Sequence, residues 1–271
     1  MTNHTDAVQA LIFFKNYLIS GSSDTTINVW SVSDSGITFF QQLKGYHTAE
    51  ISTLSIIDDG LFASGSLDTT IIIWNAFLVN LYNLTVHKGR IMTISSYEKN
   101  NTNITMANKI ASGSTDTSVV FWLRTNTLNV LRSLNGDTFY QKRQIEDIAI
   151  VQSYELGPTT PTYHIASASD DFSIMIWNST QNYNYSYNLS ANQGFHKNNV
   201  YALTVMQLAV NDNKTWVLAS GSKDRSVIIT NLSTYQPIAV LYGHLKAVVS
   251  LTPLTVNSVV GTKLASGSCD K

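Results

Sequence analysis

Histidine, serine and aspartate recur along this chain in a fixed order, and they are the three residue types of a hydrolase catalytic triad. In one set, His47 is followed by Ser64 and Asp68. In a triad the imidazole would activate the serine hydroxyl, and the carboxylate would orient the imidazole. Equivalent sets stand at His4, Ser20 and Asp24, at His87, Ser112 and Asp116, at His196, Ser220 and Asp224, and at His244, Ser266 and Asp270. An enzyme needs one activated nucleophile, so the repetition indicates architecture, and we predict no catalytic residue.

The chain has few residues that could form a phosphate-binding, metal-binding or thiol site. The chain has no phosphate-binding loop of the Gly-x-x-x-x-Gly-Lys type, and its six histidines are spread out rather than clustered as zinc ligands. The single cysteine, Cys269, allows neither a thiolate metal site nor an intrachain disulfide. We interpret Cys269 as a small turn residue, with a reactive thiol as the alternative. The sequence therefore predicts no cofactor, no metal, and a reducing cytoplasmic or nuclear location.

Composition narrows the class of protein further. Of the 271 residues, 44% are hydrophobic and only 13% are charged, and the net charge is −1. Without a long basic block, we expect no nucleic-acid partner. No apolar run approaches the roughly 18 residues of a membrane-spanning helix, and the start MTNHTDAVQALIFF does not have the pattern of a signal peptide. We therefore expect no membrane association.

Asn-x-Ser/Thr triplets occur throughout the chain, but glycosylation would require secretion. In the absence of a signal peptide we interpret them as chance products of a chain rich in Asn, Ser and Thr. They begin at Asn3, Asn83, Asn100, Asn103, Asn178, Asn184, Asn188, Asn213 and Asn231.

The histidine sets belong to a longer repeated phrase, of which LFASGSLDTTIIIWN is one copy. Its first serine falls at Ser20, Ser64, Ser112, Ser167, Ser220 and Ser266. An aspartate follows four residues later, at Asp24, Asp68, Asp116, Asp171, Asp224 and Asp270. A tryptophan follows six residues after that aspartate at Trp30, Trp74, Trp122 and Trp177, whereas the fifth copy has Thr230. Such spacing is typical of a repeat architecture.

Each phrase predicts a β-hairpin. Small residues suit a closely packed strand, the aspartate step suits a turn, and TIIIW is β-branched and aromatic. Apolar runs before and after each phrase, such as ISTLSII and PIAVLYG, supply two further strands. The histidine stands four residues before the upstream run, with Gln141 in its place in the fourth unit. Four strands per unit and no convincing helix predict small antiparallel sheets in series.

Gly-His, a strand, Ser-Gly-Ser-x-Asp and a strand ending in Trp together resemble the WD-repeat β-propeller family over essentially the whole chain. The resemblance implies an all-β propeller of four-stranded antiparallel blades, with five full blades plus half of a sixth, as a fragment of a seven-bladed ring. It implies a single domain, 1–271, with approximate blades at 4–44, 45–84, 85–136, 137–190, 191–242 and 243–271. Three features depart from the family pattern: no Trp is followed by Asp, the fourth unit lacks His, and the fifth lacks Trp.

The resemblance also assigns the repeated residues a structural role. In each blade the histidine of the entering loop would reach the aspartate of the hairpin turn, with the serine between them and the tryptophan nitrogen joining from the next strand. A buried hydrogen-bond network of this kind fixes one packing.

Partners of the family commonly bind the face that carries these turns. Three positions per blade would line it: the residue before the first strand, the second residue of that strand, and the residue before the turn aspartate. We predict that a protein or peptide contacts Glu50, Leu67, Arg90, Met92, Glu146, Asp170, Tyr201 and Lys223. Ordinary surface variation is the alternative. Glu146 and Asp170 would suit a basic peptide.

Two further features concern surfaces away from these positions. Length variation falls in the loops EKNNTNITMAN, SYELGPTTPTY and VNDNKT, on the opposite face. Tyr183, Tyr185 and Tyr187 alternate, which favours one face of a strand over an adhesive aromatic edge.

The function predicted from sequence is a non-catalytic scaffold for protein–protein interaction. The alternative is a regulatory or substrate-recognition propeller of a larger multidomain protein, of the ubiquitin-ligase adaptor or signalling ATPase type. A propeller enzyme would require an unrepeated polar cluster, and we find none. An open ring would expose the apolar faces of its end blades, so we also expect self-association.

Overall fold

The structure is a computed structural model that describes residues 3–96, 109–124, 128–134, 141–153, 162–178, 184–190, 193–210, 213–256 and 259–270. Within these ranges the chain is all-β and contains no α-helix, as the sequence predicts. The chain divides into two compact units, unit 1 (Met1–Asn135) and unit 2 (Gly136–Lys271). The long loops at 98–108 and 154–161 lie outside the described residues, as does Tyr183.

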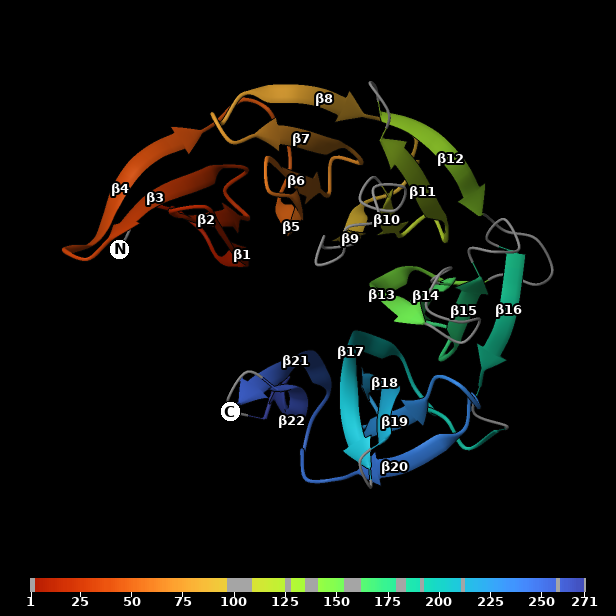
Figure 1. Cartoon of the computed structure of the whole chain (residues 1–271). Helices are drawn as coiled ribbons and strands as arrows, with labels where there is room; N and C mark the ends of the chain where they lie inside the picture. Colours follow the sequence, from red (N-terminus) through yellow and green to blue (C-terminus); the bar gives the residue numbers. More distant parts are fainter. Residues whose placement is uncertain are drawn as a thin grey trace. The chain divides into compact units, whose positions relative to one another are not determined.

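The described strands of unit 1 form three four-stranded antiparallel sheets, each ordered along the sheet as in the chain (Figure 1), and we call each sheet a blade. Blade 1 comprises β1 (Val8–Phe14), β2 (Tyr17–Ser22), β3 (Ile27–Ser33) and β4 (Gly36–Leu43). Blade 2 comprises β5 (Ile51–Asp58), β6 (Leu61–Ser66), β7 (Ile71–Asn75) and β8 (Asn80–Leu84). Blade 3 comprises β9 (Ile91–Ser96), β10 (Lys109–Ser114), β11 (Val119–Arg124) and β12 (Leu128–Leu134).

The described strands of unit 2 form two four-stranded blades and one strand pair. Blade 4 comprises β13 (Ile145–Ser153), β14 (Thr162–Ser169), β15 (Ile174–Asn178) and β16 (Asn184–Leu189). Blade 5 comprises β17 (Val200–Val210), β18 (Asn213–Ser222), β19 (Val227–Asn231) and β20 (Pro237–Leu241). Blade 6 consists of β21 (Val248–Val256) and β22 (Val259–Ser268). These sheets confirm the predicted fold class of propeller blades.

The third strand of each blade is buried on both of its faces. In β7, Ile71, Ile72, Ile73 and Trp74 are each at most 1% exposed. Residues of both faces therefore pack into apolar clusters, which explains why this strand reads as a continuous apolar run rather than an alternating one.

The second strand of each blade contains small residues because the next blade approaches it closely. A Cβ atom placed on Gly65 of β6 would lie 2.6 Å from Ile91 Cγ2 of β9. A Cβ atom on Gly21 of β2 would lie equally close to Ile51 Cγ2 of β5. Only glycine permits this approach, so the Ser-Gly-Ser phrase sets how blades pack within unit 1.

The first strand of each described blade contains a β-bulge at its second residue. In β1, Val8 pairs with Ser22 and Ala10 with Gly21, which leaves Gln9 outside the ladder. The corresponding bulged residues of the other blades are Ser52, Met92, Glu146, Tyr201 and Val249. A bulge redirects a side chain without ending the strand.

Tyr185 and Tyr187 fall on β16, as the sequence predicts. Tyr187 pairs with Ile176 of the neighbouring strand. Its ring stacks on Tyr235 with centroids 4.9 Å apart, and it packs against the apolar core of unit 2. Among the described residues, no helix combines the length and the apolar character needed to cross a bilayer.

Candidate partner-binding face

The histidine, serine, aspartate and tryptophan of each repeat meet at one end of the blade. In blade 2, His47 Nδ1 lies 3.0 Å from Asp68 Oδ2, and His47 Nε2 lies 2.8 Å from Ser64 Oγ. Because a carboxylate can only accept, Nδ1 carries the proton and Nε2 accepts from the serine hydroxyl. Trp74 Nε1 donates to the same Ser64 Oγ at 2.9 Å. The loop before β5 is thereby tied to the turn after β6.

The same bonds recur in the other blades that carry the residues. The distances from His Nδ1 to the Asp carboxylate are 2.9 Å for His4, 3.2 Å for His87, 3.0 Å for His196 and 3.1 Å for His244. Ser20, Ser112 and Ser167 accept from Trp30, Trp122 and Trp177 at 3.1, 2.8 and 2.9 Å. His196 and His244 lie 2.8 Å from Ser220 Oγ and Ser266 Oγ.

Blades 4 and 5 replace one member of the network each. In blade 4, Ser167 Oγ donates to Gln141 Oε1 at 2.7 Å, so the amide oxygen takes the acceptor role of the imidazole. In blade 5, Thr230 stands where the other four-stranded blades have tryptophan, and its buried hydroxyl has no hydrogen-bond partner. The amide replaces the imidazole as acceptor from the serine, while its N–H groups donate to the Ser167 and Ser173 carbonyls rather than to the aspartate. Threonine does not substitute for the indole.

The blade 2 geometry suits a structural network better than a nucleophile. Ser64 is fully buried and His47 is 3% exposed, so a substrate has no access to the hydroxyl. Burial lowers the pKa of His47, although Asp68 opposes the shift, and the imidazole stays neutral. Burial alone would raise the pKa of Asp68, but hydrogen bonds from Thr70 and Thr48 outweigh it and hold that pKa below its usual range.

The structure brings together the three positions that the sequence analysis assigned to partner binding in each blade. The residue before the turn aspartate donates its backbone N–H to the carbonyl of the residue before the first strand, as Leu67 does to Glu50 at 2.9 Å. The bulged residue lies one position beyond the start of that strand. We call this set the turn face: Ala7, Gln9, Ser23, Glu50, Ser52, Leu67, Arg90, Met92, Thr115, Gln144, Glu146, Asp170, Asn199, Tyr201, Lys223, Ala247, Val249 and Cys269.

In unit 1 the turn face is held by hydrogen bonds both between blades and within a blade. Ser52 Oγ of blade 2 donates to the Ile91 carbonyl of blade 3 at 2.6 Å. Within blade 3, the Arg90 backbone N–H donates to Thr115 Oγ1 at 2.9 Å. Arg90 is exposed, whereas Met92 and Leu67 are partly buried. Arg90 is therefore the more accessible of these predicted contacts.

In unit 2 the turn face gathers negative charge. The Gln144 amide donates to the Glu146 carboxylate, and the Asn199 amide donates to the Asp170 carboxylate. Burial, together with the neighbouring Asp170, raises the pKa of Glu146 to about 7 despite the Gln144 hydrogen bond. Burial and the charges of Asp170 and Glu146 also raise the pKa of Tyr201. These three predicted residues therefore share one electrostatic environment, while Lys223 is exposed.

Three residues that organise this region are not among the eight residues predicted to contact a partner. Gln144 and Asn199 hold the two carboxylates, and Asp147 Oδ2 accepts the Leu203 backbone N–H at 2.8 Å, which ties blade 4 to blade 5. An aspartate within an apolar strand was the available signal. Within the residues that the structure describes, no group of three His, Cys, Asp or Glu side chains is placed to hold a metal ion.

Comparison with known proteins agrees with this geometry. The family model described as WD domain, G-beta repeat, matches residues 1–31, 38–75 and 193–231, which contain histidine sets of blades 1, 2 and 5. Mitochondrial division protein 1 of Schizosaccharomyces pombe is 35% identical over 74 residues, and Cell division control protein 4 of Candida albicans is 33% identical over 75 residues. The chain therefore contains WD repeats.

The two relatives are much longer than the matched region. The similarity covers 27% and 28% of this chain but only 11% of each relative. WD repeats as a class are protein-interaction scaffolds and are generally non-catalytic. The WD-repeat assignment therefore gives a general role, and the identity of a partner has to come from the chemistry of the turn face.

Proposed function

We propose that this WD-repeat chain is a non-catalytic interaction platform whose unit 2 turn face binds a basic peptide segment of a partner protein. The raised pKa of Glu146 carries the proposal. Burial is the largest cause of this raised pKa, and the nearby negative charge of Asp170 adds to it. A lysine or arginine side chain would stabilise the ionised Glu146 and relieve the repulsion from Asp170.

The neighbouring side chains suit the same ligand. The amides of Gln144 and Asn199 orient the two carboxylates, so less side-chain freedom is lost when a cation binds. Tyr201 projects from a β-bulge beside them and offers an aromatic ring, a surface on which a guanidinium or ammonium group packs favourably. Tyrosine is also a residue type that often dominates binding energy.

The test is a binding measurement with a labelled peptide rich in lysine and arginine, compared with an equal peptide carrying glutamate. Fluorescence polarisation should show binding of the basic peptide alone, and Glu146→Gln combined with Asp170→Asn should weaken it by about tenfold or more. The matched control is Glu50→Gln, which removes a turn-face carboxylate from unit 1 and should change little. Equal binding of both peptides would contradict the proposal.

The pH dependence gives a second readout. A cation favours the ionised Glu146, whose pKa is about 7, so binding of the basic peptide should strengthen as the pH rises from 6 to 8. The Glu146→Gln variant should lose most of this dependence. An unchanged slope in that variant would show that another group is responsible.

A second candidate is a recognition module of a larger protein, with its activity elsewhere. The observation that favours it is that the chain spans only 11% of the length of the relatives it matches. The measurement is the mass of the native protein by immunoblot and mass spectrometry. A mass well above 29.9 kDa would support this candidate, and a mass equal to that of the chain would refute it.

A further inference from the structure

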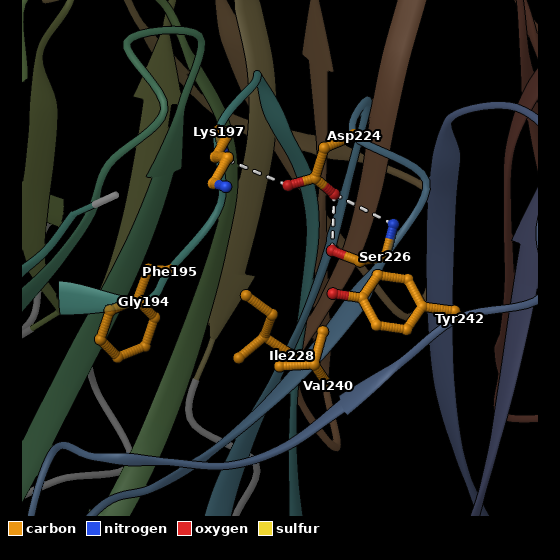
Figure 2. A pocket seen from close by; sticks show the side chains of 8 residues that line it. All are labelled: Gly194, Phe195, Lys197, Asp224, Ser226, Ile228, Val240 and Tyr242. Carbon is orange, nitrogen blue, oxygen red and sulfur yellow. Dashed lines mark hydrogen bonds between the residues drawn. The ribbon is translucent and has the colours of Figure 1, made fainter. Parts of the chain in front are cut away.

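Blade 5 contains a surface pocket of about 290 Å³, away from the carboxylates of the unit 2 turn face. It lies between the loop that enters blade 5 and the strands β19 and β20. Figure 2 shows Phe195 on one side and Tyr242 on the other, with Ile228 and Val240 between them. These four side chains make the apolar part of the wall, and Lys197, Asp224 and Ser226 make its polar part.

The pocket arises from a pair of residues that differs from its counterpart in blade 1. There, Asn28 of β3 pairs with Gln42 of β4, and the Gln42 amide reaches Asn28 Oδ1 at 3.0 Å and Thr26 Oγ1 at 3.4 Å. In blade 5 the corresponding pair is Ile228 and Val240. Valine is too short to reach the turn, so the space that Gln42 fills in blade 1 stays open.

The apolar surface runs from a buried floor to an exposed rim. Ile228 and Phe195 are 2% and 3% exposed, whereas Tyr242 is 82% exposed. Val240, on the strand at the pocket, is 39% exposed. An apolar floor that opens to solvent suits one inserted side chain with flanking chain outside.

The charged groups at this end of blade 5 are mainly positive. Asp224 is fully engaged. It accepts from the Lys197 backbone N–H at 3.0 Å and from Ser226 Oγ at 2.6 Å (Figure 2). It also accepts from His196 Nδ1 at 3.0 Å. Lys197 at the pocket, and Lys223 and Arg225 on either side of Asp224, are all exposed. Three cations therefore accompany one carboxylate whose hydrogen-bonding capacity is already used.

We propose that this pocket binds an acidic peptide segment by taking one apolar side chain, leucine or phenylalanine, between Phe195 and Tyr242. The carboxylates of the flanking ligand residues then lie near Lys197, Lys223 and Arg225. The volume fits a single side chain, and the charge selects a ligand of sign opposite to the one proposed for Glu146 and Asp170. Neither Glu146 nor Asp170 lines the pocket, so either proposal can fail alone.

The test uses three labelled peptides, Gly-Asp-Glu-x-Glu-Asp-Gly with leucine, phenylalanine or serine at x. Fluorescence polarisation at low salt should show the leucine or the phenylalanine peptide binding at least about tenfold more tightly than the serine peptide. Lys197→Gln should weaken that binding and reduce its salt dependence. Equal binding of all three peptides would overturn the proposal, since the apolar pocket would then contribute nothing.

A variant that copies blade 1 locates the site. Val240→Gln places in blade 5 the side chain that fills the equivalent space in blade 1, and it should abolish the preference for leucine or phenylalanine. Leu241→Gln is the matched control, because Leu241 is exposed on the other face of β20. If Val240→Gln lowers the melting temperature, Tyr242→Ala, at a highly exposed rim position, gives the same test. Retained preference in a folded Val240→Gln or Tyr242→Ala variant would refute the site.

Discussion

The buried histidine of blade 2 makes stability depend on pH. Burial keeps the pKa of His47 below the 6.5 of an ordinary histidine. As the pH falls below 6.5, the unfolded chain gains a proton at this residue that the folded chain does not, so the free energy of unfolding decreases. We expect His47→Gln, which copies the natural Gln141 of blade 4, to be less stable at pH 7.5 but to lose less between pH 7 and 5. Melting temperatures across this range measure both effects, and parallel curves would contradict the explanation.

The buried Thr230 hydroxyl, unlike the buried imidazole of His47, has no hydrogen-bond partner. Thr230 is fully buried, whereas valine has nearly the same shape and no hydroxyl. We expect Thr230→Val to increase the free energy of unfolding by about 1 kcal/mol, because an unsatisfied buried hydroxyl is removed. Denaturation in urea gives the measurement, with Trp74→Phe, which removes a satisfied donor from Ser64, as the destabilised comparison. A less stable Thr230→Val would indicate an unrecognised partner.

The sequence predicted the repeated residues better than the unrepeated ones. Position in the repeat identifies His47, Ser64, Asp68 and Trp74, because the serine and aspartate recur in six copies, the histidine in five and the tryptophan in four. No comparable pattern identifies Asp147, whose carboxylate accepts a backbone N–H from the next blade. Contacts between blades depend on tertiary placement, which local spacing does not encode.

At the scale of the strand, the glycine of β6 sets the distance between two blades. A methyl group on Gly65 would lie 2.6 Å from Ile91 Cγ2, 2.7 Å from Thr53 Cγ2 and 3.0 Å from Ile94 Cδ1. We expect Gly65→Ala to lower the free energy of unfolding by about 1–3 kcal/mol through overpacking. The control is Gly60→Ala in the preceding turn, where the added methyl meets only Asp58 Oδ1 at 3.5 Å. If the two variants unfold alike, the close approach does not limit packing.

Strand order and hairpins follow from the sequence, but the bulges do not. Apolar and β-branched runs separated by polar turns predict antiparallel neighbours, and the sheets have that order. The bulged residues are chemically unrelated, from Gln9 to Glu146 and Tyr201, so no residue type signals the bulge. The bulge comes instead from the register imposed by the hydrogen bond between the turn and the first-strand entrance.

At the scale of the whole molecule, the first strand of unit 1, β1, has an exposed apolar face. In β5, Ile51 and Leu54 are 1% and 8% exposed, whereas Val8 and Leu11 at the same positions of β1 are 52% and 59% exposed. Phe13 adds a third exposed side chain at 56%. Continuous apolar surface of this kind promotes association.

We therefore expect the chain to self-associate through β1. Sedimentation velocity at rising concentration should show increasing mass for the wild type, and Leu11→Glu with Phe13→Glu should suppress it. Phe77→Glu, at an 86% exposed position in a turn of blade 2, is the control and should leave association unchanged. A monomer at every concentration would show that this face is stable in water.

The pocket of blade 5 could not be predicted from the sequence. Val240 and Ile228 look like ordinary strand residues, and only the comparison with Asn28 and Gln42 in the folded blades shows that a space is left open. A cavity forms where neighbouring side chains do not fill the space between them, and the side chains around this cavity come from three separate segments of the chain. The periodicity that predicts each strand carries no information about that space.

The bulge at the second residue of each first strand places a proposed binding position apart from the residues that fold the blade. Apart from Ser52, whose hydroxyl bonds to Ile91 of the next blade, the bulged residues take no part in the ladder, the glycine contacts or the histidine networks that hold the blades. Mutation can therefore vary these positions one blade at a time while the scaffold keeps its stability. A protein built in this way is highly evolvable, since new specificities can accumulate in steps that each leave a folded molecule.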